Sequence, residues 1–180
     1  MLEQDSEICA MGHAAMFGAE ARACKRGMKL MSTALTGSCL CGEIRYTIGV
    51  PVTELRACHC AHCQKSSGAG GSVNAMVPSS AFVITQGTPK RFTVIADSGR
   101  TLHRYFCGNC GSPLYSQRAN APEFVSIRAG TLDKAEGMKI TTNIWTKSAR
   151  PWAHIDPSTQ QYPGQPDAPA TTGAPAESRR

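Results

Sequence analysis

Seven of the nine cysteines in this 180-residue chain fall into three tight clusters, and their spacing restricts the fold more than any other feature. A C-x-C pair and a distant C-x-x-C pair, each followed by glycine, supply four thiolates, enough for one closed tetrahedral site. The C-x-C-x-x-C cluster between them supplies only three. Closed four-cysteine zinc sites are structural, whereas three-ligand sites keep a position open for water or substrate. The predicted structural ligands are Cys39, Cys41, Cys107 and Cys110, and the predicted catalytic-zinc ligands are Cys58, Cys60 and Cys63.

Tetrahedral geometry explains why these spacings suit zinc. At a Zn–S distance of about 2.3 Å, neighbouring sulfurs lie roughly 3.8 Å apart. Residues i and i+2 of an extended segment point to the same side, so a C-x-C pair can bring two sulfurs together. A C-x-x-C pair reaches the same separation by turning, and Gly42 and Gly111 suit turns with unusual backbone angles. The clusters therefore predict two zinc ions per chain.

Two other uses of clustered cysteines stay open. Disulfides are typical of secreted proteins, but residues 1–30 lack the basic start and apolar run of a secretory signal. No stretch approaches the ~20 apolar residues of a membrane span. We therefore expect a cytoplasmic protein with no membrane partner, in which clustered cysteines bind metal or perform redox chemistry. A redox role remains an alternative for the middle cluster, because thiols without metal oxidise readily.

The positive charge of the chain is concentrated in its middle. Residues 33–157 hold thirteen basic and seven acidic side chains, which accounts for the whole net charge of +6. Residues 1–32 carry four of each sign, and residues 158–180 carry two of each. This excess favours an anionic small molecule or surface as partner, although a generic basic surface would look the same. Aromatic and basic residues do not interleave as they do on nucleic-acid surfaces, so no nucleic acid is expected.

One domain with two extensions accounts for the length. We expect residues 1–32 to be a poorly ordered N-terminal extension, in which Cys9 and Cys24 lack metal spacing. Residues 158–180 are rich in Pro and Gly and predict a disordered tail. The zinc domain is therefore expected over residues 33–157. The sequence does not predict an oligomeric state.

Between the extensions the pattern is typical of β-structure. Short alternating segments are separated by Gly, Pro, Asn and Asp, which predicts a mainly β domain of antiparallel sheets. Helical turns are expected at most over Leu132–Glu136 and His62–Ser66. Zinc would join two turns whose cysteines are 66 residues apart, Cys41 and Cys107. The expected strands cover residues 43–48, 72–77, 82–85, 91–96, 101–106, 113–117, 124–129 and 139–146.

The ordered motifs resemble the glutathione-dependent formaldehyde-activating enzyme family, whose domain is shared with centromere protein V. The resemblance covers about residues 33–157 and rests on Gly37-Ser-Cys-Leu-Cys-Gly42, Cys58-His-Cys-x-x-Cys63 and Phe106-Cys-x-x-Cys-Gly-Ser-Pro-Leu114, with Ala129–Asp133 and Ile144–Trp152 as later landmarks. It implies a β-tent fold of antiparallel sheets clamped by the four-cysteine zinc, and a catalytic zinc on the other three cysteines. Two departures could reshape the pocket: Ala-Gly-Gly-Ser follows Gly68 without the usual aromatic, and Asn143 stands where a His is common.

The resemblance also implies a reaction. Zinc deprotonates a bound thiol, so glutathione could enter the open position and its thiolate could attack formaldehyde, giving S-(hydroxymethyl)glutathione. The reverse step is carbon–sulfur bond cleavage, which makes the enzyme a lyase. The implied partners are a small anionic thiol such as glutathione and a small aldehyde. Among basic residues near the cluster, Arg56, Lys65 or Arg104 could hold glutathione carboxylates.

Two histidines within the middle cluster offer alternative ligands. His59 is interpreted as a residue supporting the site, and His62 as a solvent-side loop residue, although either could be a fourth ligand or a general acid or base. Two rival functions also remain: a non-catalytic, zinc-stabilised binding module, and a thiol redox sensor. Zinc-dependent turnover would distinguish the enzyme from both.

Overall fold

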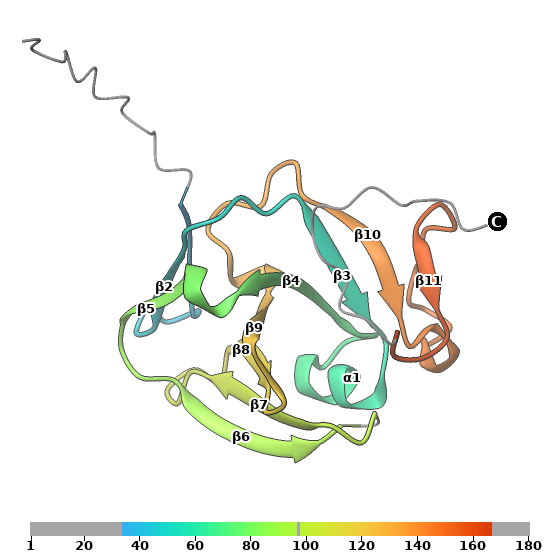
Figure 1. Ribbon diagram of the computed structural model, residues 1–180, viewed down its shortest axis with the longest axis horizontal. Helices are drawn as coiled ribbons and strands as arrows, with labels where there is room; N and C mark the ends of the chain where they lie inside the picture. Colours follow the sequence, from blue (N-terminus) through green and yellow to red (C-terminus); the bar gives the residue numbers. More distant parts are fainter. Residues whose placement is uncertain (1–33, 97, 167–180) are drawn as a thin grey trace, which may run out of the picture. The chain divides into compact units, whose positions relative to one another are not determined.

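Short alternating segments form strands in the computed structural model, which describes residues 34–96 and 98–166 (Figure 1). This part of the chain is mainly β, as predicted. The strands are β1 Leu35–Ser38, β2 Arg45–Ile48, β3 Glu54–Cys58, β4 Ser72–Pro78, β5 Phe82–Gln86, β6 Lys90–Ile95, β7 Thr101–Phe106, β8 Pro113–Arg118, β9 Ala121–Arg128, β10 Lys139–Ile144 and β11 Gln160–Tyr162. The helices are α1 Ala61–Ser67 and the 3-10 turns η1 Ser79–Ala81, η2 Ala129–Thr131 and η3 Thr146–Ser148. The interpretations of residues 1–32, with Cys9 and Cys24, lie outside the described residues.

The strands form two sheets. β1, β2 and β5 make a three-stranded sheet, and the others make a sheet in the order β11-β10-β3-β4-β9-β8-β7-β6. Most neighbours are antiparallel, as expected, but β10 runs parallel to both β3 and β11. The prediction of a disordered tail over residues 158–180 is wrong for β11, because Gln160–Tyr162 pair with β10. β3 was also not predicted as a strand. Pairing direction depends on how the connections run, and local periodicity does not record this.

The main core lies where the two sheets face each other. Tyr46 and Ile48 of β2 and Ala75 and Val77 of β4 are buried there. Successive strand residues point to opposite faces, so the alternate residues of β4 face away from this core. A Cβ on Gly37 would lie 2.3 Å from the Tyr46 ring, so glycine is required for this close approach.

The single α-helix of the described residues follows β3 and carries part of the middle cysteine cluster. Its N-cap is Cys60, whose sulfur accepts a hydrogen bond from the Cys63 backbone N–H at 3.4 Å. It ends at Gly68, which adopts a left-handed φ of 68°. The helical turn expected over His62–Ser66 is thus confirmed. The turn expected over Leu132–Glu136 is wrong, because Leu132 bridges to β1 instead.

Candidate metal centres and the adjoining cavities

The four cysteines of the outer pairs meet at the edge of the core. Cys39 and Cys41 lie in the turn between β1 and β2, and Cys107 and Cys110 lie in the turn between β7 and β8. The Sγ atoms of Cys39 and Cys41 are 3.5 Å apart, and those of Cys41 and Cys107 are 3.7 Å apart. All four sulfurs lie within 4.8 Å of one another. These separations match the roughly 3.8 Å expected around tetrahedral zinc, so this group could hold a metal ion.

The turns around this cluster place hydrogen-bond donors next to two of its sulfurs. Gly42 and Gly111 both have a φ of 75°, as the turn prediction required. The Ile44 backbone N–H donates to the Cys39 sulfur at 3.2 Å. Hydrogen bonding by the Ser112 hydroxyl, 3.2 Å from the sulfur, lowers the pKa of Cys110 to about 5. At Cys110 the thiolate form, which binds metal, is therefore favoured even without metal, whereas the pKa of Cys107 is raised.

The remaining three clustered cysteines form a second group on the other side of the large sheet. Cys58 ends β3, Cys60 caps α1 and Cys63 lies in α1. All three are buried, and their sulfurs lie within 4.8 Å of one another. No other His, Cys, Asp or Glu in the described ranges joins this group. The second group could therefore hold a metal ion with three thiolates and leave a coordination position for another ligand.

The three thiols of this group ionise unequally. Hydrogen bonds to the Cys58 and Cys60 thiols lower the pKa of Cys63, and the Ser72 hydroxyl and the charge of Arg128 lower it further. The hydrogen bonds with Cys60 and Cys63, together with burial, raise the pKa of Cys58. Cys63 is therefore the first of the three to become a thiolate. A bound cation would favour the thiolate form of all three.

Strand register places basic side chains beside these sulfurs. Asn74 on β4 lies opposite both Arg56 on β3 and Arg128 on β9, and directly paired residues of antiparallel strands share a face. Cys58 follows Arg56 by two residues on β3, so it shares that face as well. The face of the sheet that points away from the core therefore carries both arginines and a candidate ligand.

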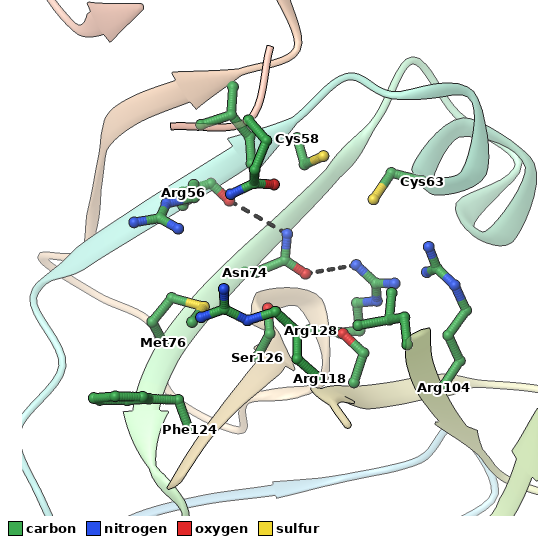
Figure 2. Close-up of a pocket in the computed structure, with 14 residues that line it drawn as sticks. Arg56, Cys58, Cys63, Asn74, Met76, Arg104, Arg118, Phe124, Ser126 and Arg128 are labelled. Carbon is green, nitrogen blue, oxygen red and sulfur yellow. Dashed lines mark hydrogen bonds between the residues drawn. The ribbon is translucent and has the colours of Figure 1, made fainter. Parts of the chain in front are cut away.

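Strands β7 and β8 complete this basic surface with Arg104 and Arg118. A cavity that is partly open to solvent lies between these strands and β3. Figure 2 shows Cys58 and Cys63 at one end of it and arginines along its walls. No aspartate or glutamate of the described residues lines it. We call this space the arginine cavity, and its defining residues are Arg56, Arg104, Arg118, Arg128, Cys58 and Cys63.

A second cavity adjoins the first at Cys58 and Cys63, which line both. Its wall includes Trp145 and Leu102, and it shares Arg104 and Arg118 with the arginine cavity. We call it the tryptophan cavity. Cys60 lines this cavity but not the arginine cavity, so Cys58 and Cys63 stand where the two spaces meet.

Trp145 is held against the sulfurs in an uncommon conformation. Its φ is 61° and its ψ is 37°, a left-handed conformation that costs an L-residue roughly 1–2 kcal/mol. It packs against the three-cysteine group, and its backbone N–H donates to Gly164 O at 3.2 Å. Strain of this kind persists where the surrounding structure fixes the residue, often at functional sites. The sequence motif located this tryptophan but did not indicate its backbone angle.

The basic residues named from the sequence are only partly placed in the site. Arg56 and Arg104 line the arginine cavity, whereas Lys65 is exposed on α1 and lines neither cavity. Arg118 and Arg128 were missed. Each stands at the last position of its strand, and only the register of the folded sheet reveals which face it occupies.

The two histidines lie outside both cavities. His59 is buried, with Nε2 2.9 Å from Asn143 Oδ1, and Asn143 in turn donates to Thr159 at 2.8 Å. Asn143, which stands where a His is common, therefore contacts the His59 ring and does not line either cavity. His62 lies half-buried within α1, not in a loop.

Comparison with known proteins identifies the domain. The model of the family described as glutathione-dependent formaldehyde-activating enzyme matches residues 34–148, more than half of the chain. The chain belongs to this family. The match spans both cysteine groups and Trp145, so the candidate metal centres lie within the shared domain of the formaldehyde-activating family.

Individual relatives are more distant. A protein of Emericella nidulans is 33% identical over 79 residues, covering 44% of this chain and 39% of that protein. A protein of Halomonas elongata is 29% identical over 103 residues, covering 55% of this chain and 66% of that protein. The names of both include the words glutathione-dependent formaldehyde-activating enzyme. The chain thus spans less than two thirds of the length of either relative.

Two further findings complete the comparison. A crystal structure of a Rhodobacter sphaeroides protein superposes with a TM-score of 0.46 at 19% identity, covering 56% of this chain and 90% of that one. Within residues 34–96 and 98–166, no helix has the length and apolar character needed to cross a membrane.

Proposed function

We propose that this member of the formaldehyde-activating family is a zinc-dependent carbon–sulfur lyase that forms or cleaves S-(hydroxymethyl)glutathione. One observation carries the proposal: three buried cysteine sulfurs lie together beside two adjoining cavities, and both cavities are lined by arginines and by no acidic side chain of the described residues. Such a junction of cavities suits the meeting of an anionic thiol and a small second reactant. Family membership supports the same reaction class.

The two cysteine groups would have different tasks. Cys39, Cys41, Cys107 and Cys110 supply a full set of four soft ligands, which suits a structural zinc. Cys58, Cys60 and Cys63 supply three, which suits a catalytic zinc. When bound there, zinc would supply a positive charge that keeps a substrate thiol deprotonated at neutral pH.

The side chains around the junction would bring the two reactants together. Arginines of the arginine cavity would hold the carboxylates of glutathione, because guanidinium groups pair with carboxylates through two parallel hydrogen bonds. Leu102 and Trp145 would enclose the aldehyde in the tryptophan cavity. Holding both reactants in place removes much of the entropy cost of a two-molecule reaction.

The bond changes are simple. The glutathione thiolate adds to the formaldehyde carbon, so a carbon–sulfur bond forms while the carbonyl π electrons move to oxygen. Water then supplies a proton to that oxygen, which gives the hydroxymethyl thioether. In the reverse direction the hydroxyl loses its proton and the carbon–sulfur bond breaks.

Exchange NMR tests this proposal, because glutathione and formaldehyde also combine without a catalyst. We expect the exchange rate between glutathione and its adduct to rise in proportion to added zinc-loaded protein. The Cys60→Ser variant should lose this acceleration because it removes a ligand of the open site. Cys24→Ser, which alters neither cysteine group, is the matched control and should keep it.

The same experiment separates the rival functions. Saturable glutathione binding without acceleration, in protein that holds both metals, would favour a binding module. Reversible disulfide formation in the three-cysteine group of protein that does not retain its second metal would favour a redox sensor. Either result would overturn the lyase proposal.

A further inference from the structure

The arginine cavity carries more positive charge than its own walls neutralise. Four guanidinium groups line it, and no carboxylate of the described residues does. A divalent metal with the three thiolates at its end would contribute a formal charge of −1, which offsets one guanidinium. Like charges that share a partly enclosed space repel each other strongly. The cavity is therefore built to receive negative charge from elsewhere.

The hydrogen bonds of Arg104 and Arg128 to Asn74 and Ser66 leave that charge in place, because these partners are neutral. Arg128 also interacts with Cys63, one of the three thiolates whose charge is counted above. Arg128, which is buried, donates to Asn74 Oδ1 at 2.5 Å. Arg104 donates to the Ser66 hydroxyl at 3.1 Å, and Arg128 approaches the same oxygen at 3.5 Å. These bonds fix the guanidinium groups in position without balancing them. They preorganise the cavity for an anion.

The other two arginines, Arg56 and Arg118, have N–H donors without an acceptor among the described residues. Arg56 Nε is buried and has no hydrogen-bond partner among the described residues. Buried polar atoms in native proteins nearly always have a partner, so this atom points to an absent acceptor. Arg118 lines both cavities, and its guanidinium makes no hydrogen bond within the described residues. In Figure 2 its side chain extends between Arg56 and Arg128.

We propose that the arginine cavity selects a thiol that carries at least two anionic groups and no ammonium group beside them, with Arg56, Arg104, Arg118 and Arg128 as the residues that determine this specificity. The inference rests on the proposed function, because it places the thiol substrate of that reaction in this cavity. It goes further by assigning the charge of the preferred thiol, for which glutathione is an imperfect match.

The imperfection lies in the γ-glutamyl end of glutathione. That end carries a carboxylate and an ammonium group on the same carbon, so a carboxylate held by the arginines brings a positive charge with it. Acylating the amine removes this positive charge and keeps both carboxylates. A dicarboxylate thiol such as mercaptosuccinate has no ammonium at all. Both compounds should therefore suit the cavity better than glutathione does.

Binding to the zinc-loaded full chain, measured by calorimetry and by tryptophan fluorescence, tests this directly. We expect N-acetylglutathione to bind about tenfold more tightly than glutathione, because it removes a like charge from the site. Mercaptosuccinate should bind more tightly than 3-mercaptopropionate, and cysteamine should bind least. The proposal would be overturned if affinity did not rise with the negative charge of the thiol, or if glutathione bound more tightly than its acetylated form.

Two anions without a thiol show which anionic group the arginines prefer and separate the two proposals. Succinate and inorganic phosphate should each compete with the thiol, and the stronger competitor identifies carboxylate or phosphate as the natural group. Competition needs no turnover. If the anions compete and affinity follows the charge of the thiol, the anion site is supported even when adduct exchange is not accelerated. Accelerated exchange with no competition by either anion would instead support the lyase and refute the anion specificity.

Variants assign the effect to the cavity. Arg118→Gln should weaken N-acetylglutathione binding about tenfold and weaken a neutral thiol such as 2-mercaptoethanol much less. Arg91, which is exposed on β6 and lines neither cavity, provides the matched control. Arg91→Gln removes the same charge and should leave both affinities unchanged. Equal losses in the two variants would mean that net charge, and not the cavity, attracts the thiol.

Discussion

Breaking the four-cysteine group should destabilise the domain more than breaking the three-cysteine group. A metal at the four-cysteine group joins Cys41 to Cys107 and closes a loop of 66 residues. The other group spans only residues 58–63, five steps along the chain. Closure entropy grows as (3/2)RT ln n, so the longer loop costs about 2 kcal/mol more to close without a cross-link. Cys107→Ser should therefore lower the free energy of unfolding by about 2 kcal/mol more than Cys60→Ser does.

Thermal unfolding of zinc-loaded protein under reducing conditions, followed by circular dichroism, measures this difference. About 2 kcal/mol corresponds to a Tm difference of roughly 5–10 °C for a domain of this size. Cys107 is also fully buried, so its replacement could act through packing, whereas Cys41 is exposed. Cys41→Ser should therefore match Cys107→Ser if ligand loss is the cause. Equal Tm values for the Cys107 and Cys60 variants would refute the assignment of a structural and a reactive site.

Three further predictions follow from the same structure. Removing metal with a chelator should abolish the protein's acceleration of adduct exchange and lower the Tm, and zinc should restore the acceleration and the Tm; acceleration that survives complete metal removal would contradict the proposal. Gly111→Ala should cost about 1–2 kcal/mol in denaturant unfolding, because the φ of 75° strains any L-residue while no atom lies within 4 Å of the added Cβ; an unchanged midpoint would show that the turn relaxes. Burial raises the pKa of Tyr46 to about 12, so the unfolded chain loses this proton first and stability falls as pH rises from about 10 to 12. Tyr46→Phe should flatten this fall in alkaline unfolding curves, and parallel curves for both proteins would show that the phenol ionises normally.

The sequence indicated which cysteines lie together because their spacing is a local feature. A C-x-C or C-x-x-C pair brings two sulfurs together through a single turn, whatever the rest of the chain does. Only one long-range assumption was needed, that the first and last pairs meet, and the sulfur separation of 3.7 Å between Cys41 and Cys107 agrees with it. The glycines at these turns were predictable for the same reason, since their positive φ follows from the turn.

The arginine cavity could not be predicted because it depends on sheet register. Arg128 and Arg56 are 72 residues apart in the sequence, yet both lie opposite Asn74. A shift of one residue on either strand would have turned these side chains to the other face. The parallel pairing of β10 and the late strand β11 were missed for a related reason. Both depend on connections between distant segments, which periodicity within a segment does not describe.

The metal content of the protein tests the central claim most directly. Elemental analysis of the chain purified under reducing conditions should give about two zinc ions per chain, and the Cys60→Ser variant should give about one. These values would support a closed four-cysteine site beside an open three-cysteine site, as the two groups of sulfurs suggest. A value near one for the unmodified chain would mean that the three-cysteine group does not retain zinc, and it would contradict the proposed catalytic metal.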